Sequence, residues 1–548
     1  MASFSLFFWK RRKRLAVLSA LAVLQLFGGR QGGSGILLPP GVDASKEDDL
    51  IVSTEKGRVR GVRHFLPNKL VVVAYLGIPF ARPPVGPLRF RHPQPTEAWS
   101  GIYNATRLPN SCYQLPDVEA FGPDFPGSNM WNPTTKVSED CLYLNVWVPK
   151  TTRLRRSAVM VWIYGGGFYS GTATLNVYDG KILAAENNVI VVSIAYRIGA
   201  FGFLYLNDAA APGNAGLFDQ LMGLEWVQHN IRHFGGDPDN VTLFGESAGS
   251  VSVSLHLLSP LSHSKYQRAI LQSGTANMPW ATLTAAEAHR RSVELAVEVL
   301  GCDASGGGES LATCLRAVSA HRLVTEQYIT QGPLQFPFLP VVDGVFLPDA
   351  PEELLRLKKF KRCPILTGSN QNEGSFFVIY EVLEFLNLQR MTMTRAEFIV
   401  SMRRMFNFYP QFRREISQIG LDAITFQYTN WLDVDDTQEN VRLLDASLGE
   451  SQFICPLNQF AKAYAEAGEN VYMYYLTQRY ASNPWPRWMG VLHGDDIMFI
   501  FGEALKPGQN YSQDDKDVSR AMMTYWTNFA KTGLANVTSP FTIYYDLL

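Results

Sequence analysis

One segment of the chain is more informative than any other: Val241-Thr242-Leu243-Phe244-Gly245-Glu246-Ser247-Ala248-Gly249. Its first four residues are apolar or β-branched, which is typical of a buried strand. A Gly-x-Ser-x-Gly pattern follows at once, and small residues continue into an expected helix. In such a strand-to-helix turn the flanking glycines remove steric clashes and the serine hydroxyl is exposed above the sheet. The sequence therefore predicts that Ser247 is a nucleophile.

A second strand-like run ends in three consecutive glycines, Trp162-Ile163-Tyr164-Gly165-Gly166-Gly167-Phe168. A glycine run can be no more than a flexible turn, but at the end of a strand it can aim backbone N–H groups into a cavity. An ester hydrolase needs such donors, because negative charge develops on the carbonyl oxygen in the transition state. We expect Gly166, Gly167 and Ala248 to supply these three donors as an oxyanion hole.

A serine nucleophile also needs a base, and an acid that orients the base. Among nine histidines, His493 stands on a glycine-flanked loop late in the chain, in Gly490-Val491-Leu492-His493-Gly494. Hydrolases with this type of elbow order the triad as serine, acid, histidine. Glu373 lies in the required interval just past a strand-like run, although many other carboxylates lie there too. The predicted triad is Ser247, Glu373 and His493.

Strand-like and helical segments alternate through the chain. Short runs typical of buried strands are 159–164, 189–195, 241–244, 269–272, 364–368 and 471–476. Between two of them, apolar residues recur at helical spacing from Leu217 to Ile231. Such alternation indicates an α/β fold whose largely parallel sheet is covered by helices on both faces. We find no internal repeat and predict one domain, in which the charged, helical stretches near 281–322 and 392–445 are insertions.

The N-terminus has the pattern of an export signal. Five basic residues at 10–14 precede an apolar run from Leu15 to Phe27. We therefore expect a signal peptide over 1–29 and a catalytic domain over 43–548. An uncleaved anchor is the alternative, but the run is shorter than the about 20 residues that span a bilayer. The composition, 46% hydrophobic and 18% charged, excludes disordered and fibrous classes, and no basic excess suggests nucleic-acid binding.

Six cysteines in an exported chain are expected to pair where geometry allows. The pairs closest in sequence are Cys112 with Cys141 and Cys302 with Cys314, and the state of Cys363 and Cys455 stays open. N-glycosylation sequons also fit a secretory route. They occur at Asn104, Asn240, Asn510 and Asn536.

Several longer motifs carry a resemblance to a known family. They are Ser-Glu-Asp-Cys-Leu-Tyr-Leu-Asn at 138–145, the segment 196–202, Gly-Gly-Asp-Pro at 235–238 and the Gly-Glu-Ser-Ala-Gly elbow. From about residue 55 to 533 the chain resembles the carboxylesterase type-B family, and within it cholinesterases of a kind closer to the invertebrate enzymes. The resemblance implies a single-domain α/β-hydrolase fold, catalysis by the same triad through an acyl-enzyme, no metal and no cofactor. It also implies the disulfides Cys112–Cys141 and Cys302–Cys314.

The resemblance further implies a small cationic substrate, a choline ester such as acetylcholine. Its quaternary ammonium group cannot donate a hydrogen bond, but aromatic faces attract it by roughly 2 kcal/mol when it is desolvated. The positions that match choline-binding residues are Trp131, Glu246, Phe376 and Tyr178. Those that match the active-site gorge and the acyl pocket are Asp117, Tyr169, Trp280, Leu334, Phe336, Phe377, Tyr380 and Trp485.

Two features depart from the family pattern. Acetyl-specific members narrow the acyl pocket with two phenylalanines, whereas here Phe336 is kept and the other position is Leu334, which implies tolerance of larger acyl groups. The resemblance also fades near Asn536. We therefore expect a domain that is truncated at its C-terminus, without the usual oligomerisation or anchor tail and without a partner for Cys455.

Two other functions stay open on the sequence alone. A broad-specificity carboxylesterase would use the same triad but would have no need of Trp131, Asp117 and Phe376. A non-catalytic adhesion protein of the neuroligin kind would share the fold but lack one or more triad residues, and all three are present here. We expect a secreted or extracellular enzyme, at a cell surface or synapse, with no nucleic-acid partner and no evident membrane association.

Overall fold

Continuous apolar runs form a nine-stranded sheet in the computed structural model, which describes residues 48–116, 124–150, 156–330, 334–381, 392–407 and 416–535. Across the sheet the strands are β18 (Val471–Leu476), β17 (Ile365–Asn370), β14 (Arg268–Gln272), β13 (Gly236–Glu246), β9 (Ser157–Ile163), β10 (Ile190–Ile194), β8 (Tyr143–Pro149), β4 (Val71–Pro79) and β3 (Val62–Phe65). Neighbours from β18 to β10 are parallel, and β8, β4 and β3 continue the sheet antiparallel. The prediction of a mostly parallel sheet is confirmed.

The six predicted strands correspond to β9, β10, β13, β14, β17 and β18. The prediction was too short for β13, which begins at Gly236, and it missed β3, β4 and β8 altogether. Those three form the antiparallel side of the sheet, where the connections carry no long crossover helix. Without that alternation of strand and helix, the sequence pattern used for the other strands was absent.

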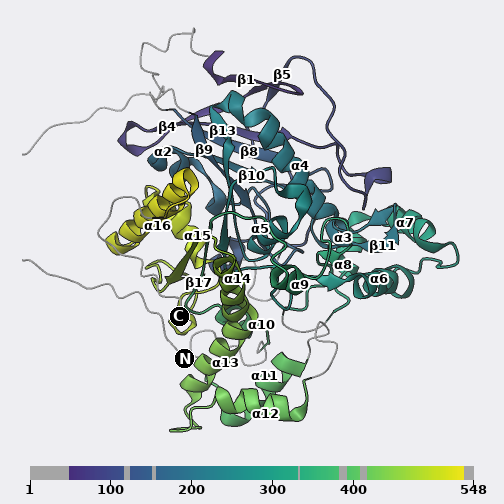
Figure 1. Ribbon diagram of the computed structural model, residues 1–548, viewed down its shortest axis with the longest axis vertical. Coiled ribbons are helices and arrows are strands. Elements are labelled where there is room, and N and C mark those ends of the chain that lie inside the picture. The colour runs from purple at the N-terminus through teal and green to yellow at the C-terminus, as the bar shows by residue number, and fades with distance from the viewer. Residues whose placement is uncertain are drawn as a thin grey trace, which may run out of the picture.

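Helices cover both faces of the sheet (Figure 1). The predicted helix is α4 (Ala215–Asn230), and it lies with α5 (Ala248–Leu258) on one side of the sheet. On the other side lie α2 (Lys181–Asn187), α15 (Asp495–Ile500) and α16 (Gln513–Thr532). Most residues of β9, β10 and β17 are buried, as expected for strands covered on both faces.

The two charged stretches outside the sheet are helical, as predicted. The first contains α6 (Ala285–Val293), α7 (Gly307–Ala317) and α8 (Ala320–Glu326). The second contains α11 (Arg395–Asn407), α12 (Gln418–Gln427) and α13 (Thr437–Gly449), which lead into α14 (Cys455–Glu466). Figure 1 shows the second group below the sheet, beside α10 (Ser375–Glu381).

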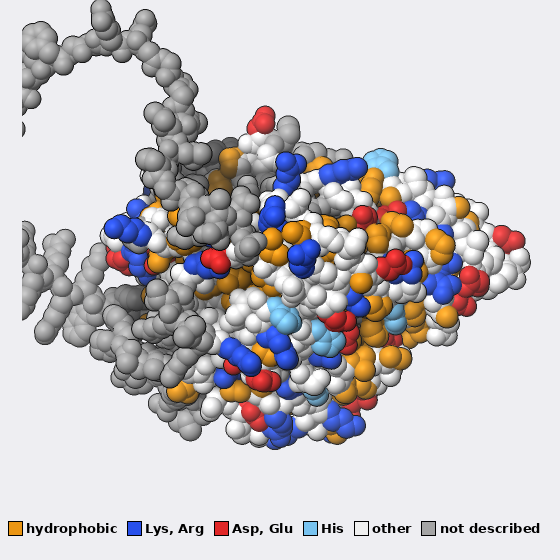
Figure 2. Space-filling view, turned by 90° about the horizontal axis from the view of Figure 1, so that it is seen from above, with side chains coloured by type: hydrophobic (Ala, Val, Ile, Leu, Met, Phe, Trp, Pro, Cys, Tyr) orange, Lys and Arg blue, Asp and Glu red, His pale blue; other side chains and the backbone are white. Residues whose placement is uncertain are grey.

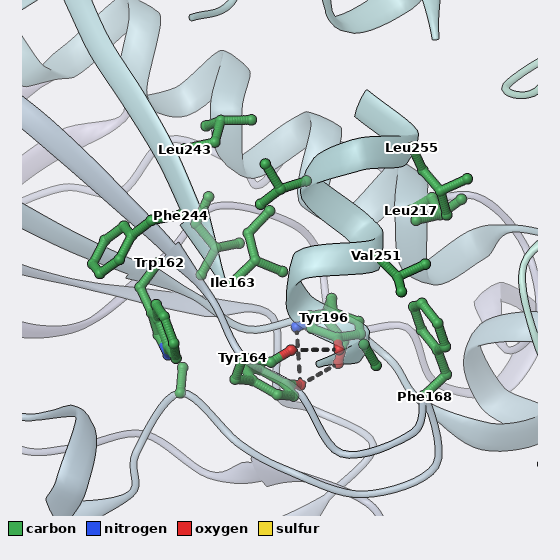
Figure 3. Packing of buried hydrophobic residues seen from close by; sticks show 14 of the residues in the cluster. Trp162, Ile163, Tyr164, Phe168, Tyr196, Leu217, Leu243, Phe244, Val251 and Leu255 are labelled. Carbon is green, nitrogen blue, oxygen red and sulfur yellow. Dashed lines mark hydrogen bonds between the residues drawn. The ribbon is translucent and has the colours of Figure 1, made fainter. Parts of the chain in front are cut away.

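Aromatic packing fixes the ends of the central strands (Figure 3). The ring of Trp162 is fully buried and lies 4.8 Å from that of Phe244 on the neighbouring strand. Just past β9 and β10, the rings of Tyr164 and Tyr196 stack at 4.3 Å. Each hydroxyl donates to the other residue's carbonyl, at 2.6 and 2.8 Å. The glycine run that follows Tyr164 therefore starts from a rigid point.

Both expected disulfides, Cys112–Cys141 and Cys302–Cys314, are present. Cys363 is a buried free thiol, and Cys455 is an exposed one. Among the sequons, Asn104 and Asn510 are exposed. The side chain of Asn240 instead donates to the carbonyl of Lys531 and accepts from Arg268. The expected signal peptide and Asn536 lie outside the described residues.

The described surface carries charges of both signs. Figure 2 shows basic and acidic side chains interspersed over the face at the β1 (Ile51–Thr54) and β5 (Ile102–Asn104) end of the molecule. Within the described residues, no helix has both the length and the apolar character needed to cross a bilayer, and no three metal-ligating side chains gather into a site.

A buried ion pair joins the segment after β10 to α4, and its loss is expected to destabilise the fold. Arg197 donates to both carboxylate oxygens of Asp219, at 2.8 and 2.7 Å, and neither side chain is more than 3% exposed. Asp219→Asn should lower the free energy of unfolding by about 3–5 kcal/mol, because the guanidinium stays buried without a counter-charge. Urea unfolding measures this loss. The exposed pair of Glu353 with Arg356 is the control, and equal effects of Glu353→Gln and Asp219→Asn would contradict the prediction.

Candidate active site

Ser247 lies in the turn between β13 and α5, with φ +55° and ψ −127°. A non-glycine residue in this region is strained by about 1–3 kcal/mol and persists only where its surroundings fix it. Its N–H donates to the carbonyl of Gln272 at 2.9 Å. A Cβ on Gly249 would lie 2.1 Å from the carbonyl oxygen of Ile163, and one on Gly245 2.6 Å from Gly249. The glycines of the motif are therefore required by close packing of the turn on β9.

Glu373 and His493 are brought together from loops that follow β17 and precede α15. His493 Nδ1 lies 2.6 Å from Glu373 Oε2. The other carboxylate oxygen of Glu373 accepts from the Ser273 hydroxyl and from the N–H of Asn370, both at 2.6 Å. An ionised carboxylate can only accept, so Nδ1 carries the proton and the lone pair of a neutral ring is on Nε2. Nε2 is therefore the atom available for proton transfer.

Nε2 of His493 faces the nucleophile elbow. It lies 3.2 Å from Oε1 of Glu246, the residue before Ser247, and has no hydrogen-bond partner among the described residues. The imidazole packs against two phenyl rings, with centroids 5.2 Å from Phe377 and 4.7 Å from Phe453, and these two rings stack on each other at 5.2 Å. Phe453 was not predicted, since it lies in a segment without a recognisable motif.

The charges around the ring change its pKa. Burial lowers the pKa of His493, but the carboxylates of Glu246 and Glu373 and the hydrogen bond to Glu373 outweigh it, so the pKa is raised above its ordinary value. Burial has the opposite effect on a carboxyl group: it raises the pKa of Glu246, and the positive charge of the nearby imidazolium opposes this rise. From the sequence alone we expect the pKa of an unperturbed histidine, about 6.5. The pKa of His493 in the structure is higher because two buried carboxylates lie beside the ring.

The glycine run lies against the elbow. A Cβ on Gly165 would be 3.0 Å from Cβ of Ser247. Gly166 and Gly167 follow with φ of +114° and +57°, a backbone that favours glycine. Within the described residues no protein group accepts a hydrogen bond from the N–H of Gly166, Gly167 or Ala248. These three N–H groups are thus available for an oxyanion.

A partly buried tryptophan lies beside the base. A Cβ on Gly494 would be 3.4 Å from Cη2 of Trp131 and 3.7 Å from Oε1 of Glu246. The indole and the carboxylate thus meet at the residue next to His493. Tyr178 is buried, and this burial, followed by the charge of Glu246, raises the pKa of its hydroxyl. An aromatic face and a buried anion are the two groups that attract a quaternary ammonium.

Several predicted aromatic residues form one chain of ring contacts. Phe376 lies 5.6 Å from both Phe377 and Trp485. Phe377 stacks on Phe453, and Trp280 lies 5.7 Å from Phe453 and 5.7 Å from Phe336. Four further residues were predicted for this region. Tyr169 packs against Phe336, Leu334 is buried with a φ of +57°, and Asp117 and the side chain of Tyr380 lie outside the described residues.

The strand order, the nucleophile elbow and the glycine run beside it define an α/β-hydrolase. A family model described as "Carboxylesterase family" matches residues 48–544. The chain belongs to this family and is a carboxylic ester hydrolase that acts on a small-molecule substrate.

Three relatives specify the comparison further. The chain is 43% identical to the acetylcholinesterase of Electrophorus electricus over 527 residues, and 44% identical to that of Danio rerio over 528 residues. It is 45% identical to the acetylcholinesterase of Bungarus fasciatus over 496 residues. Each match covers 90% of this chain, and it covers 82%, 82% and 79% of the respective relatives. The resemblance to cholinesterases is confirmed, and the adhesion-protein alternative is set aside.

The raised pKa of His493 predicts how kcat/KM depends on pH. A general base must be neutral, so the rate should rise with pH through a limb above about 6.5. Glu246→Gln removes one of the charges that raise the pKa of His493, and the limb should therefore move to lower pH. The measurement is kcat/KM from pH 5 to 10 with an uncharged ester, so that cation binding does not contribute. Glu503→Gln, a buried carboxylate paired with Lys506, is the control. A limb that stays or moves upward in the Glu246 variant would contradict the assignment.

Proposed function

We propose that this protein hydrolyses choline esters, acetylcholine among them, through an acyl-enzyme on Ser247. The observation that carries the proposal is the meeting of Trp131, Glu246 and the His493 loop at one point. A general carboxylesterase would have no need of an aromatic face such as that of Trp131 at this place. The identity to acetylcholinesterases over most of the chain supports the same substrate class.

The mechanism follows from the placement of the groups. Ser247 Oγ attacks the ester carbonyl carbon while its proton passes to Nε2 of His493, and Glu373 stabilises the imidazolium that forms. The N–H groups of Gly166, Gly167 and Ala248 bind the oxyanion. The tetrahedral intermediate collapses, and choline leaves with the proton held by His493. Water then attacks the carbonyl carbon of the acyl-enzyme while its proton passes to His493. His493 returns that proton to Ser247 Oγ, which leaves as the carboxylic acid is released.

The cation is proposed to rest on the face of Trp131, with Glu246 as the nearest buried anion. A quaternary ammonium makes no hydrogen bonds, so its affinity depends on polarisable faces and on charge, both of which act more strongly away from water. Phe376, which packs edge-on against Trp485, would close the other side. Tyr178 is buried close enough to Glu246 for that charge to raise the pKa of its hydroxyl, which supports its proposed place at this site.

The acyl group is proposed to lie between Trp280, Phe336 and Leu334. A leucine is smaller than the second phenylalanine of acetyl-specific relatives, so larger acyl groups should be accepted. Phe453 limits the size of acyl group that should be accepted, because its ring lies 5.7 Å from Trp280 and also packs on His493. The room gained at Leu334 is therefore bounded by a ring that the sequence pattern did not reveal.

We further propose that the enzyme acts outside the cell. Two disulfides support this location, because disulfides form and persist in oxidising compartments. Asn104 and Asn510, which are exposed, are the proposed glycosylation sites. Asn240 is a weaker candidate, since its amide is bonded to Lys531 and Arg268.

Replacing Trp131 should separate charged from uncharged substrates. In Trp131→Ala, kcat/KM for acetylcholine should fall by a factor that corresponds to about 2–3 kcal/mol, because the desolvated cation–π contact is lost. The uncharged carbon isostere should lose much less. Trp431→Ala, at an exposed tryptophan between α12 and α13, is the control, and Ser247→Ala gives the background rate. Equal losses for both esters would favour a broad-specificity carboxylesterase.

Acyl specificity should respond to two positions in opposite directions. Leu334→Phe should lower the ratio of butyryl to acetyl choline ester in kcat/KM, since a misplacement of the carbonyl near 1 Å can reduce the rate about a hundredfold. Phe453→Val should raise the same ratio. Each change in pocket size is worth roughly 1–3 kcal/mol of discrimination. A ratio unchanged by both variants would place the acyl group elsewhere.

A further inference from the structure

The loop with the predicted acid and the loop with the predicted base are hydrogen-bonded side by side. The N–H of Asn372 donates to the carbonyl of Val491 at 2.9 Å, and the N–H of Val491 donates back to Oδ1 of Asn372 at 3.0 Å. Asn370 adds a third bond, from its side-chain amide to the carbonyl of Leu492 at 2.7 Å. His493 is the next residue, so its backbone position is set by these bonds.

The side chain of Asn372 is held from a third element. Its Nδ2 donates to Oδ2 of Asp445 at 2.7 Å. Asp445 lies on α13, is only 5% exposed and belongs to the helical group outside the sheet. The helix packs tightly at this point, because a Cβ on Gly374 would lie 2.2 Å from the carbonyl oxygen of Asp445. Figure 1 shows α13 beside α10, which begins at the acid loop.

The amide of Asn372 cannot rotate without breaking both contacts. One end accepts from Val491 and the other donates to Asp445, and a flip would oppose like atoms at both ends. The loop before His493 also packs closely against the amide of Asn372, since a Cβ on Gly490 would lie 2.0 Å from Oδ1 of Asn372. The hydrogen bond from Asn372 to Asp445 is also costly to break, because the carboxyl group of Asp445 is buried and needs its hydrogen-bond donors.

We propose that Asn372 and Asp445 form a positioning pair, through which α13 sets the place of His493 relative to Glu373 and Ser247. The inference rests on the proposed Ser–Glu–His mechanism and adds residues that do not touch the substrate. Proton transfer and attack depend on sub-ångström alignment, and a shift near 1 Å can reduce the rate about a hundredfold. The helical group outside the sheet thereby takes part in catalysis.

An exchange of the two side chains tests the pair. N372D keeps the acceptor for Val491 but places a carboxylate against that of Asp445, where two like charges cannot both stay ionised at hydrogen-bond distance. The double variant N372D/D445N restores one donor and one acceptor, with their places exchanged. We expect kcat for acetylcholine to fall at least tenfold in N372D at pH 8, with KM changed less than twofold. In the double variant kcat should return to within about threefold of the wild type.

Active sites are counted with a fluorophosphonate, so that kcat refers to folded enzyme only. N440D is the matched control, since Asn440 lies on the same helix and its amide donates to the carbonyls of Met393 and Val434. That variant should lose thermal stability without any loss of kcat per titrated site. If N372D does not fold, N372A replaces it, with the same expected loss of kcat.

Two outcomes overturn the proposal. One is a kcat per site that stays unchanged in the single variant while only the melting temperature falls, which would make the pair purely structural. The other is a double variant no more active than N372D. His493→Ala, assayed in parallel, keeps this question apart from the proposed function. Turnover that survives in His493→Ala would refute the triad itself, whereas an inactive His493→Ala with an unaffected N372D would refute the positioning pair alone.

Discussion

The site depends on one constraint, the burial of an imidazole among carboxylates. His493 contacts Glu373 at 2.6 Å and lies 3.2 Å from Glu246, and a third carboxylate, Asp496, is buried close by. Charges removed from water are tolerated only when paired or hydrogen-bonded. Asp496 accordingly accepts from Gln272 and Tyr474, at 2.9 and 2.8 Å. These donors come from β14 and β18, so the parallel side of the sheet supplies the hydrogen bonds that the buried carboxyl group of Asp496 needs.

A second constraint is steric and acts on the turn that carries Ser247. The strained turn at Ser247 is held because β9 approaches it so closely that Gly245 and Gly249 have no room for a side chain. The same approach brings the N–H groups of Gly166 and Gly167 to the turn. Tyr164 and Tyr196, bonded to each other's carbonyls, fix where this glycine run begins. The rigid scaffold thus holds the proposed oxyanion donors in place in advance, and preorganised donors of this kind contribute most to electrostatic catalysis.

The sequence could predict the features that depend on local patterns, but not those that depend on contacts between distant segments. Buried parallel strands and the elbow are local patterns, and the order of serine, acid and histidine follows from the fold, so these were within reach. The fully antiparallel strands β4 and β8 lacked the alternation with helices and were missed. Phe453, Asn372 and Asp445 act through contacts between segments distant in sequence, and no local pattern marks them. The raised pKa of His493 likewise requires knowing which carboxylates surround the ring.

Glu246 connects the two halves of the proposed chemistry and sets them against each other. Its charge is proposed to attract a cation next to Trp131, yet the same charge raises the pKa of His493. Under the proposed function the substrate itself relieves this conflict. A quaternary ammonium placed beside Glu246 compensates its field at the imidazole, since a nearby positive charge disfavours the protonated ring. The cation would therefore help to make the base neutral in the complex. An uncharged ester of the same shape would not, so the fraction of molecules with a neutral His493 would be larger in the complex with a choline ester.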